Sequence, residues 1–112
     1  MATFEQGDVI KVPFPYADRA ARQHRPALVV SKGGLATHGF LWVLMITSAE
    51  NRGWPGDVSV SNLAMAGLPA PSVIRTAKIA TIEAVDAERL GRVPAPALKQ
   101  ALLRVGRELG FS

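Results

Sequence analysis

The spacing of apolar residues divides the chain into a strand-rich first part and a helical end. Short apolar runs bounded by Gly, Pro, Asn or Asp are typical of strands, and strict alternation is typical of a strand with one exposed face. The run at 40–47 is apolar at consecutive positions, which predicts a central strand covered on both faces. We predict strands at residues 9–12, 26–31, 40–47, 57–61, 72–75 and 78–82. The last two segments are either separate strands or one bent strand.

The end of the chain has helical periodicity instead. Leu98, Leu102, Val105 and Leu109 recur at spacings of four, three and four, which places them on one face of a helix. Pro96 suits the first turn of that helix and Gly110 suits the position just after its last turn. Residues 87–90 predict a single helical turn ended by Gly91, and the segments 18–23, 33–39, 49–56 and 67–71 read as loops.

This order of elements predicts a mainly β fold, either a small barrel or a strongly bent sheet, with the C-terminal helix over one open end or face. The chain has 112 residues, of which 48% are hydrophobic, so residues 1–112 are expected to form one domain with its own core.

Composition excludes several kinds of chemistry. The chain has no cysteine, so it cannot use disulfides, thiolate metal sites or a cysteine nucleophile. It has no phosphate-binding glycine motif, no serine-hydrolase elbow and no zinc-protease motif. We expect a cytoplasmic protein without a membrane span, because the start lacks a signal-peptide pattern and no apolar run approaches ~20 residues.

The net charge of +4 favours a polyanionic partner, with nucleic acid as the first candidate and simple solubility as the alternative. The nine acidic residues do not cluster in the way that two-metal phosphate chemistry requires. If the protein cleaves a phosphodiester, we therefore expect it to act without a metal or other cofactor. RNA permits this because its 2′-OH is a built-in nucleophile, which needs a base, a stabilised phosphorane and a proton for the leaving oxygen.

Arg25 is the first candidate for this chemistry. Pro26 restricts Arg25 to extended backbone, and its planar guanidinium matches two phosphate oxygens; the alternative is a loop arginine paired with a carboxylate. Thr47 and Ser48 end the central strand and offer hydroxyl donors, although both residue types are ordinary at a strand end. Arg75 interrupts an apolar run, for which a solvated strand edge is the simplest explanation.

The remaining candidates lie in loops. Arg22 belongs to a basic loop that can attract RNA, and His24 can serve as an acid or base near neutral pH or be merely solvated. Trp54 can stack on a base, or it can anchor its loop on the core.

Several motifs in this order resemble the PemK/MazF (Kid) family of toxins from type II toxin–antitoxin systems. The pairing of GDV…VPFP with RPALVV is the most specific of them, and the resemblance covers nearly the whole chain. The motifs are residues 7–9 and 12–15, 25–31, 46–48, 71–75, 79–82 and 88–91, followed by the helix.

The resemblance implies a small SH3-like barrel of the CcdB/PemK type with a C-terminal helix, acting as a homodimer. It implies a metal-independent, sequence-selective endoribonuclease that cuts single-stranded RNA, often mRNA, to a 2′,3′-cyclic phosphate and a 5′-OH. It also implies a cognate antitoxin protein that blocks the RNA groove and binds DNA together with the toxin.

Residue by residue, Arg25 matches the family's catalytic arginine and Thr47 its catalytic threonine or serine. Arg75 matches a second active-site arginine of the Kid branch, but that branch has an aspartate where this chain has Ala77. The resemblance therefore favours an Arg25/Thr47 scheme in which Arg25 stabilises the phosphorane and the general base is open. The expected RNA contacts are Arg22, His24, Ser48 and Arg75.

A second hypothesis keeps the fold without the catalysis. On this alternative the protein binds nucleic acid, or it inhibits DNA gyrase as CcdB toxins of this fold do. Residues 109–112 match the apolar C-terminus of those toxins only weakly.

Overall fold

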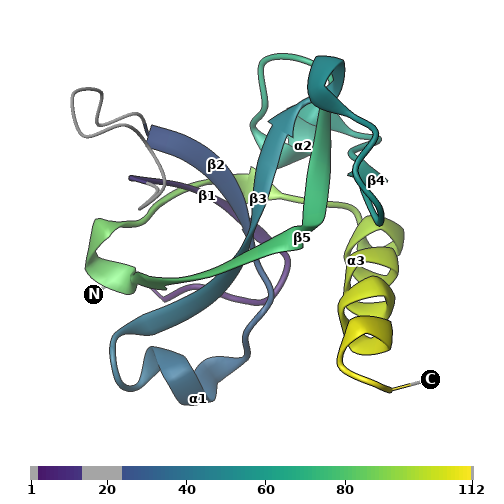
Figure 1. Cartoon of the computed structure of the whole chain (residues 1–112). Helices are drawn as coiled ribbons and strands as arrows, with labels where there is room; N and C mark the ends of the chain where they lie inside the picture. Colours follow the sequence, from purple (N-terminus) through teal and green to yellow (C-terminus); the bar gives the residue numbers. More distant parts are fainter. Residues whose placement is uncertain (1–2, 14–23, 112) are drawn as a thin grey trace.

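Antiparallel strands curl into a single half-barrel sheet in the computed structural model, which describes residues 3–13 and 24–111 (Figure 1). Within those residues the strand order is β4-β5-β3-β2-β1-β6. The mainly β fold class with a C-terminal helix is confirmed. The strands are β1 (Asp8–Pro13), β2 (His24–Val29), β3 (Phe40–Ser48), β4 (Val58–Ser59), β5 (Ser72–Glu83) and β6 (Glu88–Arg92).

Short helical segments connect these strands, and one longer helix ends the chain. The helical segments are α1 (Gly33–Ala36), η1 (Ala49–Asn51), α2 (Leu63–Ala66), η2 (Ala84–Asp86) and α3 (Ala95–Glu108). α3 stands beside β4 and β5, on the outside of the curl (Figure 1). No helix in the described part of the chain is long and apolar enough to cross a membrane.

The sheet is buried on both faces over its middle, because adjacent residues of β1, β2 and β3 belong to different apolar clusters. Val9 packs in the cluster beneath α2 and α3, whereas Ile10 packs in the cluster inside the curl. β3 lies between β2 and β5, as its apolar run predicts, but Phe40 and Trp42 at its start are exposed. The prediction of cover on both faces therefore holds only for the middle of β3, from Val43 to Ile46.

β5 is one bent strand, which decides between the two alternatives for residues 72–82. β3 pairs Leu44 with Ile79 but pairs the next residue, Met45, with Arg75. Residues 76–78 are therefore extra on β5 and form a bulge, and bulges bend a strand and redirect its side chains.

The sequence prediction was wrong for residues 87–90, which form no helical turn, because residues 88–90 belong to strand β6. The turn lies earlier, at η2, and β6 pairs with β1. The fully buried carboxylate of Asp8 fixes this pairing, because it accepts hydrogen bonds from Arg89 at 2.7 Å and from Arg92 at 3.3 Å. The helices α1 and α2 lie in or beside segments read as loops, and the strand expected at 57–61 is only two residues long.

α3 begins after Pro94, with Pro96 in its first turn, and is followed by Gly110 at φ +89°, as predicted. Its buried positions are Ala97 and Ala101, not the whole predicted leucine stripe. Leu109, which follows the last residue of the helix, is 68% exposed.

Candidate active-site cleft

Arg25 and Thr47 lie on the neighbouring strands β2 and β3, just beyond the last pair that these strands form. That pair is Ala27 with Met45, and each of the two residues lies two positions past it on its own strand. Side chains two residues apart on a strand point to the same face, so both side chains extend the face that carries Ala27 and Met45.

A cleft of about 380 Å³ opens where these two strands end. Its lining includes Arg25, Thr47, Ser48 and the loop at residues 68–71, which follows α2. The remaining lining residues are Pro26, Ile46, Asn51 and Ser72. The two residues predicted to be catalytic therefore share one cleft, and the connection between α2 and β5 forms part of its wall.

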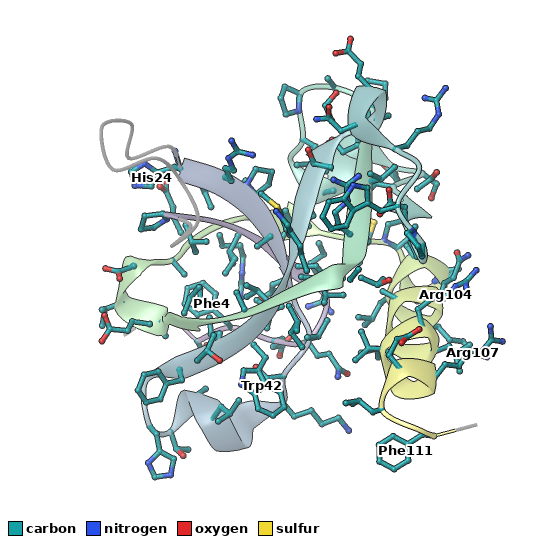
Figure 2. All side chains as sticks on the ribbon, in the orientation of Figure 1. Phe4, His24, Trp42, Arg104, Arg107 and Phe111 are labelled. Atoms are coloured by element: carbon teal, nitrogen blue, oxygen red, sulfur yellow. The ribbon has the colours of Figure 1, made fainter. Side chains whose placement is uncertain are left out.

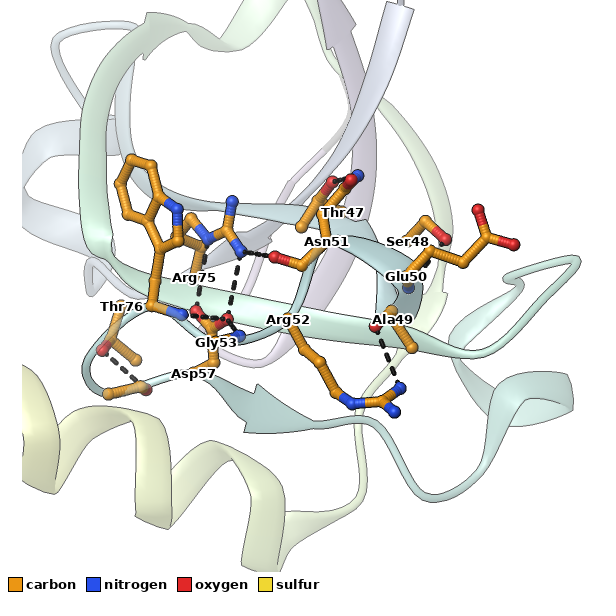
Figure 3. A network of polar contacts seen from close by, with 12 residues as sticks. Thr47, Ser48, Ala49, Glu50, Asn51, Arg52, Gly53, Asp57, Arg75 and Thr76 are labelled. Carbon is orange, nitrogen blue, oxygen red and sulfur yellow. Dashed lines mark hydrogen bonds and ion pairs between the residues drawn. The ribbon is translucent and has the colours of Figure 1, made fainter.

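The hydroxyl of Thr47 is held from one side. Asn51 donates from Nδ2 to Thr47 Oγ1 at 3.1 Å, so the Thr47 O–H remains available to donate elsewhere (Figure 3). Ser48 also has a local role, because its Oγ accepts the backbone N–H of Glu50 at 3.2 Å and caps η1. The cap starts the turn that brings Asn51 back over Thr47.

Arg75 lies next to the cleft but does not line it. The expectation of a solvated edge residue was wrong, because the Arg75 side chain is only 8% exposed and forms an ion pair with Asp57 at 3.1 Å. Nε and a terminal nitrogen of Arg75 each donate to a different oxygen of Asp57, and the same terminal nitrogen also donates to the backbone carbonyl of Asn51 (Figure 3). RNA contact through Arg75 stays a prediction, and its burial makes an indirect role the simpler one.

Asp57 balances this buried cation. Its carboxylate accepts four hydrogen bonds, two from Arg75 and two from the backbone N–H groups of Gly53 and Trp54. Burial acts to raise the pKa of Asp57, but the hydrogen bond and charge of Arg75, together with the two backbone donors, bring the net pKa below its usual value of 3.8. Asp57 is therefore the ionised partner of Arg75 at neutral pH.

Trp54 covers this ion pair and does not insert into the core. Its ring lies 4.3 Å from the Arg75 guanidinium carbon and 5.3 Å from the Lys78 ammonium, and the residue is 43% exposed. The indole ring therefore makes cation–π contacts with both cations, of which Arg75 is the buried one.

The other predicted contacts lie apart from the cleft or outside the described residues. His24 is exposed at the start of β2 (Figure 2) and does not line the cleft, and alternation along the strand turns it away from the face of Arg25. Arg22 lies outside the described residues. Ala77, at the bulge of β5, lines a different hollow of about 410 Å³ together with Arg104 of α3.

Sequence reasoning missed Asn51 and Asp57. Asn51 belongs to no recognisable sequence motif, and its contact with Thr47 depends on the turn of η1. Asp57 did offer a signal, because it is the only acidic residue between Glu50 and Glu83 and so the only nearby carboxylate for Arg75. Among the residues that the structure describes, no three His, Asp or Glu side chains are grouped to hold a metal ion.

Fold and site together define a class: a small basic protein with a curled antiparallel sheet, whose cleft at the strand ends presents an arginine and a hydroxyl. The model of the family described as "PemK-like, MazF-like toxin of type II toxin-antitoxin system" matches residues 5–108. The chain belongs to this toxin family.

Solved structures show the same fold. A MazF from Deinococcus radiodurans has a TM-score of 0.81 and 23% identity, with 99% of this chain and 100% of that chain covered. A MazE–MazF complex from the same organism has a TM-score of 0.77 and 22% identity, with full coverage of both chains. An "endoribonuclease in complex with its cognate antitoxin" from a mycobacterial species has a TM-score of 0.76 and 18% identity, with 98% of each chain covered. The search of curated proteins found no match.

Proposed function

We propose that this toxin is a metal-independent, sequence-selective endoribonuclease that cleaves single-stranded RNA by using the RNA's own 2′-OH as the nucleophile. The observation that carries the proposal is the convergence of Arg25 and Thr47 on one cleft from neighbouring strands. One charged fork and one hydroxyl donor fit the oxygens of a phosphodiester.

The reaction is an attack of the 2′-oxygen on the adjacent phosphorus, in which the P–O bond to the 5′-oxygen of the next nucleotide breaks. The 2′-OH loses its proton to a base, and the leaving 5′-oxygen gains one. Arg25 would stabilise the dianionic phosphorane, while the Thr47 O–H, whose oxygen already accepts from Asn51, would donate to a phosphoryl oxygen. The products are a 2′,3′-cyclic phosphate and a 5′-OH.

The test is incubation of the purified protein with a long single-stranded RNA in EDTA, followed by mapping of the cut ends. We expect discrete cuts that disappear when the nucleotide before the cut is 2′-deoxy. Arg25→Ala should lower kcat by about 100- to 1000-fold, since one preorganised donor to the transition state contributes about 2.7–4 kcal/mol.

Arg107→Ala is the matched control, because it removes the same charge from an exposed position on α3 (Figure 2). Equal activity of the wild type and Arg25→Ala, or no cleavage by the wild type, would contradict the proposal. Salt-dependent RNA binding without cleavage would instead favour a non-catalytic binder, and inhibition of supercoiling would favour a gyrase inhibitor.

We further propose a cytoplasmic homodimer that a cognate antitoxin neutralises. The MazE–MazF complexes with the same fold support the antitoxin part of this proposal. Light scattering should give twice the mass of one chain, and co-expression of the antitoxin encoded beside the toxin should relieve growth inhibition. A monomer at micromolar concentration would contradict the dimer.

A further inference from the structure

We propose that the buried Asp57–Arg75 ion pair is a positioning device for the Thr47 hydroxyl, and that it acts through Asn51. The proposal rests on the proposed function, because it gives Thr47 a catalytic role. It assigns Arg75 and Asp57 as positioning residues, neither of which needs to touch RNA.

A continuous series of contacts joins the ion pair to the cleft (Figure 3). Arg75 donates to the backbone carbonyl of Asn51, which fixes the main chain at the end of η1. The side chain of the same Asn51 then donates to Thr47 Oγ1 at 3.1 Å. Arg75 therefore holds the backbone of Asn51, and the side chain of Asn51 in turn holds the Thr47 hydroxyl.

The ion pair is built to be rigid. Two nitrogens of the Arg75 guanidinium contact the two Asp57 oxygens at 3.2 and 3.1 Å, and this forked geometry fixes orientation as well as distance. Both side chains are 8% exposed, so water competes little with these contacts. The Trp54 ring also packs on the guanidinium, 4.3 Å from its central carbon.

The loop between β3 and β4 is fixed at its far end as well. Asp57 accepts from the backbone N–H groups of Gly53 and Trp54, at 3.2 and 3.3 Å. Thr76, from the bulge of β5, donates to the carbonyl of Gly56 at 2.8 Å. Residues 49–57 are thus tied to β5 at two points, which fixes the main chain from which the Asn51 side chain reaches Thr47.

The burial of the pair distinguishes this role from direct substrate binding. A guanidinium that already donates to Asp57 and Asn51 would have to break those contacts to bind a phosphate. Asn51, by contrast, lines the cleft itself. The position of the Thr47 hydroxyl should therefore respond to Asp57 even in the absence of RNA.

The test is a double-mutant cycle of Asp57→Asn and Asn51→Ala on full-length protein, with RNA cleavage as the readout. We expect Asp57→Asn to lower kcat about tenfold and to change KM less than twofold. In the Asn51→Ala background the same substitution should have no further effect on kcat, because the link to Thr47 is already cut. An equal loss in both backgrounds would overturn the proposal.

Asp8→Asn is the matched control, because it also neutralises a buried carboxylate paired with arginines, but at the β1–β6 pairing. It should lower stability and leave kcat unchanged. If Asp57→Asn fails to fold, Arg75→Lys takes its place, since lysine keeps the charge but not the fork. A wild-type kcat in folded Arg75→Lys would overturn the proposal.

A second readout does not depend on activity. The methyl resonance of Thr47 in the free protein should move in Asp57→Asn or Arg75→Lys and stay in place in Asp8→Asn. If the wild type cleaves no RNA, the proposed function fails, and this resonance still decides the positioning. An unmoved Thr47 methyl in a folded variant would refute it.

Discussion

Gly67 is the position where one added methyl group should damage the fold most, and the structure separates the two reasons. Gly67 ends α2 at φ +70°, in the left-handed region that alanine disfavours. A Cβ there would also meet backbone of β6, lying 2.7 Å from the carbonyl carbon of Leu90 and still nearer to its oxygen. Carbon atoms normally pack at about 3.5–4.0 Å, so α2 or β6 would have to move.

Gly110 is the matched control, because it follows α3 at φ +89° but has no atom within 4 Å of an added Cβ. Gly110→Ala should therefore cost only the left-handed backbone penalty, about 1 kcal/mol. Gly67→Ala carries that penalty plus overpacking of about 1–3 kcal/mol, for a total of about 2–4 kcal/mol. The difference between the two variants isolates the steric part.

Equilibrium urea unfolding measures both values, with an unchanged slope showing that the same surface unfolds. On a melting curve, 1 kcal/mol corresponds to about 4 °C for a chain of this size. The reasoning is refuted if Gly67→Ala is no less stable than Gly110→Ala. Because residues 68–71 form a wall of the cleft, Gly67→Ala should also lower RNA cleavage at temperatures where it is folded.

Three further outcomes follow from the same contacts. The pKa of Asp57 is lower in the folded state, so ionised Asp57 stabilises the fold. This contribution is fully present above the unfolded pKa of about 4 and is lost as pH falls through the folded pKa. In urea titrations, the wild type should therefore lose more stability than Asp57→Asn between pH 7 and pH 3. Trp54→Ala should cost about 1 kcal/mol of stability by removing the cation–π cover of Arg75, measured in the same titrations, and a neutral effect would contradict that role. In a Trp42→Phe background the remaining Trp54 fluorescence should change in Asp57→Asn and not in Asp8→Asn.

Local pattern predicted most of the strands and the ends of α3, because alternation and proline or glycine positions act over a few residues. β6 escaped this reasoning. Residues 88–92 have no apolar alternation, and their extended state comes from pairing with β1 and from the Asp8 contacts. Tertiary pairing of this kind overrides local propensity.

The candidate site also has a part that the sequence predicted and a part that depends on tertiary structure. The resemblance to a family singled out Arg25 and Thr47, and the strand register explains why they share a cleft. The contacts of Asn51 and Asp57 depend on how a nine-residue loop, residues 49–57, closes over β5. No local pattern encodes that closure, since it combines a Ser cap, a 3₁₀ turn and a buried charge from another strand.

The bulge of β5 also explains how this chain can lack an aspartate at Ala77. The extra residues 76–78 direct Ala77 toward the hollow beside α3, whose lining includes Arg104 and Leu109 (Figure 2 labels Arg104). The cleft with Arg25 and Thr47 has a separate lining. The carboxylate that pairs with Arg75 comes from Asp57 in the preceding loop, so the charge of Arg75 is balanced without an acidic residue at position 77.

Ala77→Asp should therefore leave kcat and KM for RNA within twofold of wild type, because the new carboxylate would face Arg104 across the hollow. The double variant Asp57→Asn/Ala77→Asp should be as slow as Asp57→Asn alone, for the same reason. A faster enzyme in either case would mean that residue 77 can reach the cleft or Arg75, and that the bulge does not separate the two sites. Single-turnover cleavage of one defined RNA compares all four proteins directly.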